Sequence, residues 1–391
     1  MNHRTRVLGA VGLTVALFLA VQLGALALVE PFQEAGHQTV ENPDDPTNSI
    51  FYFGIILVAT AFMLVTFKYD VQWLIKGLII GVSVMLAWFV FAELVPPVVT
   101  AGPMNVFAVL GALAIGAALY WYPEWYVIDA AGIVIGAGAG ALFGISFGLF
   151  PAILLLAVLA VYDAISVYGT EHMLDLAEGV MDLKIPVILI VPTTLSYSYL
   201  EAGTADSLED RDERNERDGR EEEDRPADRK ERATADAGGD EAGIETDADE
   251  RSESGGSSLE ERPIDDSPEG DDVEGDTATA TDADASVDEE PDADGRDAFF
   301  IGLGDAVIPT ILVASAAYFL EAGTLDVPGI ALNLPALGAL LGTTAGLLVL
   351  MAMVLKGRPH AGLPLLNGGA IGGYLLGAVA SGLSITTALG F

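Results

Sequence analysis

The longest apolar stretch of the chain reads VIDAAGIVIGAGAGALFGISFGLFPAILLLAVLAVYDAISV and covers residues 127–167. The hydrocarbon core of a bilayer takes about 20 apolar residues of helix, so roughly 40 such residues predict two crossings instead of one. Gly144, Gly148 and Pro151 mark the break, because both residue types interrupt helices. The stretch therefore predicts a helical membrane protein, with neighbouring spans at residues 127–149 and 151–167.

Seven other apolar stretches extend this prediction along the chain. Each is long enough for about one crossing of the hydrocarbon core. They cover residues 7–29, 50–67, 73–95, 104–122, 298–320, 329–355 and 362–389. We therefore expect an all-α polytopic membrane protein with nine transmembrane helices, six before and three after a long polar segment.

The polar segment, residues 201–297, carries most of the charge of the protein. It holds 39 Asp and Glu residues against 11 Lys and Arg residues, while the whole 391-residue chain has a net charge of −38 and is 51% hydrophobic. Such a composition cannot build a core, so we expect a disordered acidic loop. The separation of apolar and acidic parts excludes a single soluble globular enzyme, and the excess of acids over lysines suggests a halophilic archaeon as the source.

Composition also limits the partners and cofactors. A polyanion is a poor partner for nucleic acid, which is bound through clustered Lys and Arg. The chain has no Cys, and its four His are scattered, which argues against a thiolate or histidine metal site. These residues are His3, His37, His172 and His360. We therefore predict no metal and no nucleic acid, and a lipid bilayer as the surroundings.

The distribution of basic residues predicts the orientation in the cell membrane. With nine spans and a cytoplasmic N-terminus, all 18 Lys and Arg residues fall in or beside loops on the cytoplasmic side. Cytoplasmic loops of membrane proteins are enriched in these residues. We therefore predict a cytoplasmic N-terminus, a cytoplasmic acidic loop and an extracellular C-terminus.

The segment before the acidic loop predicts two further elements. Residues 170–183 alternate apolar and acidic side chains at helical spacing, which is typical of an amphipathic helix at the membrane interface. Residues 185–192 read Ile-Pro-Val-Ile-Leu-Ile-Val-Pro, with mostly β-branched residues in the middle and a proline toward each end, which favours an extended strand. The predicted organisation is therefore residues 1–169, 170–200, 201–297 and 298–391: six spans, an interfacial segment, the acidic loop and three spans.

Two acids lie within predicted spans, where an ionisable side chain is costly and indicates function. Asp163 lies about five residues from the end of its span, and Asp305 about seven residues into the next, so both are expected roughly 8–11 Å below the cytoplasmic boundary. Two carboxyls that share a proton can activate water and polarise a peptide carbonyl. Asp129 and Glu93 lie nearer span ends, and we expect them to be hydrated boundary residues.

The same two acids permit other interpretations. Buried carboxyls also serve as proton or cation sites in transporters and channels, or as polar contacts between helices. The residues alone therefore leave a protease, a transporter or channel, and a catalytically inactive membrane scaffold open.

Short motifs around the two acids carry a resemblance to a known family. Tyr162-Asp163 in one predicted span and Gly302-Leu303-Gly304-Asp305 in the next are similar to the motifs of the presenilin and signal peptide peptidase family, and the chain most resembles the archaeal presenilin homologues. The resemblance implies an intramembrane aspartyl protease with Asp163 and Asp305 as the catalytic pair. It further implies single-span membrane proteins or signal peptides as substrates, with no cofactor and no evident accessory subunit.

A third family motif, Pro-Ala-Leu, is altered here. The matching position reads Ala361-Gly362-Leu363-Pro364, in which the leucine is kept and two small residues precede it. Small residues preserve close packing, so the resemblance implies a supporting role for this segment. The alteration is also the best argument for an inactive scaffold.

The resemblance finally implies that extended segments beside the site pair with an unwound substrate. Peptide hydrolysis needs an extended backbone, which a sheet edge can present. The expected substrate-pairing residues are Val187, Ile188, Leu189, Ile190, Phe299, Phe300 and Ile301.

Overall fold

The structure, a computed structural model, describes residues 3–69, 71–169, 187–194, 197–200, 298–356 and 361–391. All of these residues belong to one compact unit. The predicted amphipathic helix at residues 170–183 and the predicted disordered loop at 201–297 lie outside the described residues.

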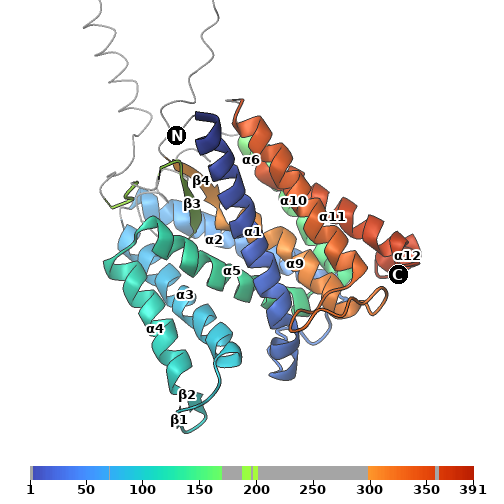
Figure 1. The fold of residues 1–391 in the computed structure, drawn as a ribbon, viewed down its shortest axis with the longest axis horizontal. Helices are drawn as coiled ribbons and strands as arrows, with labels where there is room; N and C mark the ends of the chain where they lie inside the picture. Colours follow the sequence, from blue (N-terminus) through green and yellow to red (C-terminus); the bar gives the residue numbers. More distant parts are fainter. Residues whose placement is uncertain (1–2, 70, 170–186, 195–196, 201–297, 357–360) are drawn as a thin grey trace, which may run out of the picture. The chain divides into compact units, whose positions relative to one another are not determined.

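Helices make up most of this unit (Figure 1). Among the described residues, seven helices are long and apolar enough to cross a membrane, and two further apolar helices are shorter, at 16 and 17 residues. The seven are α1 (His3–Glu34), α2 (Thr47–Lys68), α3 (Gln72–Leu94), α5 (Trp125–Ser146), α6 (Leu149–Gly169), α10 (Leu334–Val354) and α11 (Gly362–Ala380). The shorter two are α4 (Val106–Trp121) and α9 (Leu303–Phe319).

Several predicted span boundaries were wrong. The break in the long apolar stretch falls at Phe147 and Gly148, and Pro151 lies in the first turn of α6, where a helix needs no proline N–H. The predicted last span was too long, since α11 ends at Ala380 and a separate short helix, α12 (Ile385–Ala388), follows. Gly382 between them has φ 86°, a left-handed backbone conformation that favours glycine and turns the chain.

The prediction of an all-α protein was wrong in one further respect. Two small antiparallel sheets are present, β1 (Thr100–Ala101) with β2 (Met104–Asn105), and β3 (Ile188–Pro192) with β4 (Ala298–Gly302). The five residues of β4 were predicted as the start of a span, because their apolar composition does not distinguish a buried strand from a helix. The N-terminal end of α1, β3 and β4 lie at the same end of the helix assembly (Figure 1).

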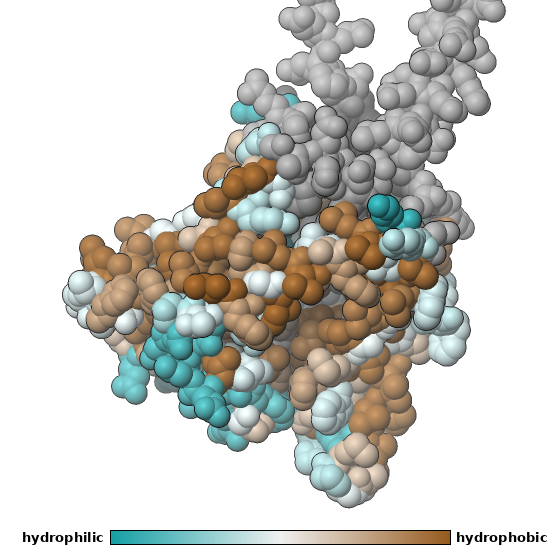
Figure 2. All heavy atoms as spheres, turned by 180° about the vertical axis from the view of Figure 1, so that it is seen from behind, coloured by the Kyte–Doolittle hydropathy of each residue, from teal (hydrophilic) through white to brown (hydrophobic). Residues whose placement is uncertain are grey.

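Apolar side chains cover much of the outer surface (Figure 2). In α2 only 11% of the most apolar 18-residue stretch is buried. Its side chains Ile50 and Val58 expose 67% and 70% of their surface. Contiguous apolar surface of this kind is covered by lipid or by another protein. The polar backbone of these segments is satisfied inside each helix, as a hydrocarbon environment requires.

The interior is built from two groups of helices. Helix α1 packs against α5 and α9, while α10 packs along α11 in the most extensive helix contact of the described residues (Figure 1). Helices α6, α9, α10 and α11 share one apolar core that includes Leu156, Leu312 and Tyr374, all fully buried. This core fixes the ends of α6, α9 and α11 relative to one another.

Asn333 connects the end of α9 to the start of α10. Its side-chain oxygen accepts a hydrogen bond from Ala336 N at 2.8 Å, and its amide nitrogen donates to Ala316 O and Leu320 O, both at 2.7 Å. The side chain is 1% exposed. One side chain therefore caps α10 and satisfies carbonyls at the end of α9.

Replacing Asn333 by Ala is expected to lower the free energy of unfolding by about 1–3 kcal/mol, because three buried backbone groups lose their partner. Thermal unfolding in detergent measures the effect. The control is Asn48→Ala, which removes a solvent-exposed hydrogen bond to Asn42 O and should change the melting temperature little. Equal shifts for the two variants would contradict the assigned role of Asn333.

Candidate active site

The first predicted catalytic residue, Asp163, lies near the end of α6 and faces the start of α11. Its Oδ2 accepts a hydrogen bond from Leu363 N at 3.0 Å, and Gly362 N–H also donates to this carboxyl. Helix α11 begins at Gly362, with Ala361 as its N-cap residue. The first N–H groups of a helix have no partner within the helix, so the carboxyl of Asp163 fills the place of a capping side chain.

The altered Pro-Ala-Leu segment is thus the first turn of α11, and its backbone forms part of the site. Pro364 lies in that turn, where its missing N–H costs no hydrogen bond. Ala361 is buried, and its N–H donates to the hydroxyl of Tyr168 at 3.4 Å. Asp163 is held by backbone N–H groups, so the replaced side chains do not remove these hydrogen bonds.

The second predicted catalytic residue, Asp305, lies in the first turn of α9, directly after β4. The expected depth of seven residues into a span was wrong, because residues 298–302 form a strand and do not advance with the rise of a helix. Two glycines make room for the carboxyl. A Cβ added at Gly302 or at Gly362 would lie 3.4 Å or 3.3 Å from Asp305 Oδ2. Gly304 is exposed, and a Cβ added there would lie 3.9 Å from Ile308 Cδ1.

The start of α11 brings the two carboxyls together. Gly362 donates its N–H to Asp163 and also lies beside Asp305 Oδ2. The Asp163 carboxyl is close enough to act electrostatically on Asp305. Both side chains are partly exposed, so water can reach them. The arrangement places two acids and two backbone N–H groups around one point.

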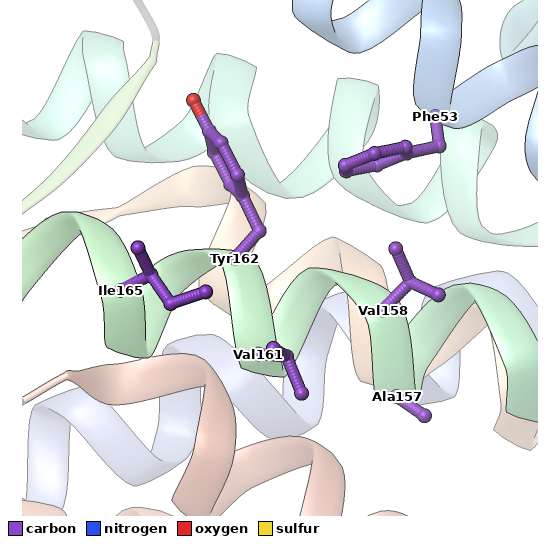
Figure 3. A pocket seen from close by; sticks show the side chains of 6 residues that line it. All are labelled: Phe53, Ala157, Val158, Val161, Tyr162 and Ile165. Carbon is purple, nitrogen blue, oxygen red and sulfur yellow. The ribbon is translucent and has the colours of Figure 1, made fainter.

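Tyr162 lies beside Asp163 in sequence but faces a different way. Its ring contacts Phe53 of α2 edge to face, with ring centroids 5.9 Å apart. Both side chains line a hollow of about 370 Å³ on the surface of α6 (Figure 3). The other lining residues are Ala157, Val158, Val161 and Ile165, so the hollow is apolar. Tyr162 therefore belongs to the apolar surface between α2 and α6, next to Asp163 in the sequence.

The expected substrate-pairing residues form a sheet with each other. In β3 and β4, Leu189 pairs with Ile301, and Ile190 pairs with Phe300. Just outside β3, Val187 O accepts a hydrogen bond from Leu303 N at 2.7 Å. All residues of β3 are buried, while all residues of β4 are partly exposed. The remaining members of the predicted set, Ile188 and Phe299, belong to the same two strands.

The prediction that Asp129 is a hydrated boundary residue was wrong. Its side chain is only 4% exposed, and its Oδ1 accepts a hydrogen bond from Ile190 N at 2.8 Å. Glu93 is a boundary residue, with its side chain 24% exposed, and it pairs with His37 at 3.1 Å. The sequence held a signal for Asp129, since it is an acid inside the predicted span 127–149, but nothing in the sequence identifies its partner strand.

Glu124, just before α5, is a second buried acid that holds the chain near β3, and the sequence analysis did not identify it. It accepts hydrogen bonds from Ser198 Oγ at 2.6 Å and Tyr199 N at 3.0 Å. Burial by itself would raise the pKa of Glu124, but these hydrogen bonds hold that pKa below its ordinary value. Glu124 therefore stays ionised and fixes the chain after β3.

Within the residues that the structure describes, no group of three or more His, Cys, Asp or Glu side chains is arranged to hold a metal ion. The groups that form the site are two carboxyls, backbone N–H groups and small residues.

The fold and the site define a multi-pass helical membrane protein with an aspartate pair beside a short sheet. The family model described as signal-peptide peptidase, presenilin aspartyl protease matches residues 15–219 and 276–383. The chain therefore belongs to this family, and the resemblance inferred from the sequence motifs is confirmed.

Solved structures agree with this assignment. Two structures of a presenilin family intramembrane aspartate protease, in the C222 and P2 space groups, resemble this chain with TM-scores of 0.53 and 0.50. Both are 27% identical to it in sequence. The first match covers 96% of this chain and 99% of the other, and the second covers 94% and 96%. No curated protein matches the chain.

Proposed function

We propose that this protein is an intramembrane aspartyl protease that uses Asp163 and Asp305 to hydrolyse peptide bonds of membrane-embedded substrates. The observation that carries the proposal is the meeting of both carboxyls at Gly362, in a chain that belongs to a family of aspartyl proteases. A pair of acids around one partly exposed point suits general acid and base catalysis.

The proposed reaction needs only the two acids and water. One carboxylate takes a proton from a bound water, whose oxygen attacks the carbonyl carbon, while the other, protonated carboxyl donates its proton to the carbonyl oxygen. The C–N bond of the tetrahedral gem-diol then breaks: the first, now protonated carboxyl gives its proton to the leaving nitrogen, and the second, now ionised carboxyl takes a proton from a hydroxyl of the gem-diol, which restores the starting pair. No covalent enzyme intermediate forms and no cofactor takes part. The two aspartates are interchangeable in this scheme until the protonated one is identified.

We further propose that substrates are single-span membrane proteins or signal peptides that enter sideways from the lipid. The apolar hollow lined by Phe53 and Tyr162 supports this route, because it opens on the surface of α6 one residue from Asp163 (Figure 3). An apolar helix can lie against such a surface without exposing polar groups to lipid. The positive-inside pattern of the sequence supports a cut near the cytoplasmic side.

An unwound substrate is proposed to add as a strand to the edge of β4 opposite β3, with which no other described strand pairs. The partial exposure of β4 supports this choice over β3, which is buried throughout. The hydrogen bond from Leu303 N to Val187 O identifies these two residues as a hydrogen-bonded pair, and such pairs alternate with non-hydrogen-bonded pairs along an antiparallel ladder. Phe300 and Ile190 form a non-hydrogen-bonded pair, so the backbone N–H and C=O of Phe300 point away from β3. The N–H of Phe300 is therefore available to a third strand.

Replacing Phe300 by Pro is expected to reduce cleavage about 10-fold, since proline removes one outward N–H that a substrate strand would use. Proline is tolerated where the N–H of an edge strand faces outward, so the melting temperature should change little. The control is Phe300→Ala, which loses the same ring, including its contact with Tyr199, but keeps the N–H. Equal cleavage by the two variants would argue against pairing at β4.

A cleavage assay tests the proposed function as a whole. Purified protein in detergent and high salt is incubated with a peptide that contains one transmembrane segment, and fragments are measured by mass spectrometry. Cleavage that an aspartyl-protease transition-state analogue blocks supports the proposal. Ion-dependent flux in liposomes that persists with the analogue present would instead indicate a transporter or channel, and the absence of both activities an inactive scaffold.

A further inference from the structure

We propose that Asp129 is a positioning residue for this site, because its carboxyl closes the outer edge of β3 and thereby fixes the sheet that leads into Asp305. The inference rests on the proposed function for its effect on cleavage, but its structural part is testable separately. It assigns a role to a buried acid that takes no part in the proposed reaction.

The burial of Asp129 calls for a reason, since a carboxyl within a membrane span is costly. The residue lies in the second turn of α5 and is 4% exposed. Its Oδ1 bonds Ile190 N at 2.8 Å, while its Oδ2 is buried without a hydrogen-bond partner among the described residues. Among the described residues, the Asp129 side chain therefore makes one hydrogen bond, to the backbone of β3.

The register of the sheet explains why Ile190 needs a partner. Val187 and Leu303 form a hydrogen-bonded pair, so the N–H of Ile190, three residues further along, points away from β4. Ile190 is fully buried, and a buried N–H without an acceptor destabilises a protein strongly where water is absent. Asp129 supplies that acceptor. The same contact occupies the edge, so a third strand cannot pair with β3 at this position.

Helix α5 contacts the start of α9 as well as β3. Leu303, which follows β4 and begins α9, packs against α5 one and two turns beyond Asp129. A Cβ added at Gly132 or Gly136 would lie 3.7 Å or 3.3 Å from Leu303 Cδ1. The α5 surface therefore fixes β3 through Asp129 and the start of α9 through Leu303, two residues before Asp305. Loss of the first contact frees the sheet relative to the catalytic acid.

Four variants of the full chain test this inference. Asp129→Leu and Asp129→Ser remove the acceptor, the first with a larger apolar side chain that also branches at Cγ and the second with a side chain too short to reach. Asp129→Asn keeps an oxygen that can accept from Ile190 N. Ala130→Leu changes the adjacent, exposed position of α5 and serves as the control. Two acceptor-free variants are used so that misfolding of one does not leave the inference without a test.

Three measurements separate positioning from general stability. Amide hydrogen exchange in residues 187–192 should rise about 10-fold in Asp129→Leu and Asp129→Ser, because the edge bond is lost. Their cleavage rates should fall about 10-fold, since a small misplacement of reacting groups lowers the rate steeply. Mass spectrometry should find the cuts spread over several neighbouring peptide bonds. Asp129→Asn and Ala130→Leu should resemble the unaltered protein in all three measurements.

Distinct outcomes overturn the inference and the proposed function. Unchanged exchange at residues 187–192 in the folded acceptor-free variants, or damage in Asp129→Asn as large as in Asp129→Leu, would overturn the role of Asp129. Slower cleavage at unchanged positions would mean that Asp129 only stabilises the protein, and this result would also overturn the inference. If the unaltered protein cleaves no peptide, the proposed function fails, while the exchange measurement still decides whether Asp129 closes the edge.

Discussion

Replacing Asp163 or Asp305 by Asn is expected to lower the rate of transmembrane peptide cleavage about 10²–10⁴-fold, the usual contribution of a general acid or base. An amide neither accepts the proton of the attacking water nor donates a proton to the carbonyl oxygen as a carboxyl does. Either replacement therefore interrupts the same proton exchange. The rate is measured in detergent with the single-span peptide described above.

The expected loss is chemical and not a loss of fold. Asn at position 163 keeps an oxygen that can accept the hydrogen bond from Leu363 N, so the start of α11 stays in place. Melting temperatures of both variants should match that of the unaltered protein. Asp326→Asn is the matched control, because it makes the same chemical change at an exposed position of the loop between α9 and α10.

Combining the two replacements provides an internal check. Groups that act as a unit give non-additive losses, so the Asp163→Asn/Asp305→Asn protein should cleave no more slowly than either single variant. Independent, multiplying losses would indicate that the acids do not share one reaction. Cleavage in either single variant above about a tenth of the normal rate would contradict its assignment as a catalytic acid or base.

The second large effect is expected where α10 and α11 touch through glycines. Replacing Gly373 by Ala should lower the free energy of unfolding by about 1–3 kcal/mol or more, as overpacking does in a tight interface. A Cβ at Gly373 would overlap Gly338 O, and a Cβ at Gly342 would overlap Gly369 O. Both obstacles are backbone atoms, which cannot move aside without separating the two helices. Small residues allow such close approach of helices in membranes.

Gly372→Ala is the matched control for Gly373→Ala. The two glycines are neighbours within α11, so the helix-forming preference of alanine acts equally on both. No atom lies within 4 Å of a Cβ at Gly372, which is exposed. Thermal unfolding in detergent should therefore show a lower melting temperature for Gly373→Ala and an unchanged or higher one for Gly372→Ala. Equal shifts would mean that the glycine contact does not hold the helices.

Much of the fold is predictable from the sequence because lipid imposes a simple rule. A span must be apolar over about 20 residues, so most crossing helices were located within a few residues of their bounds. The errors occur where apolar composition has two structural solutions. Residues 298–302 are as apolar as a span but form β4, and residues 385–388 form α12 after a turn at Gly382.

The candidate site was also predictable in part, because the cost of placing polar groups in lipid marks individual residues. Asp163 and Asp305 stand out because charge inside a span is costly, and the glycines around Asp305 belong to a short recognisable motif. Asp129 carries the same signal but lies near a span end, where hydration was the simpler explanation. Its contact with Ile190 joins residues 61 positions apart. No local pattern records such a partner.

Composition by itself determined that this chain is a multi-pass membrane protein with two costly buried acids, because apolar length and buried charge are properties of single segments. Short motifs gave the resemblance to the presenilin and signal peptide peptidase family, which the family model confirmed. Only the tertiary structure decided that Gly362 lies beside both acids, that β3 pairs with β4 instead of standing alone, and that Asp129 closes the outer edge of β3. The physical reason is that each of these contacts satisfies a buried polar group or fills a space between segments far apart in the chain. Their partners are fixed by packing and not by sequence spacing.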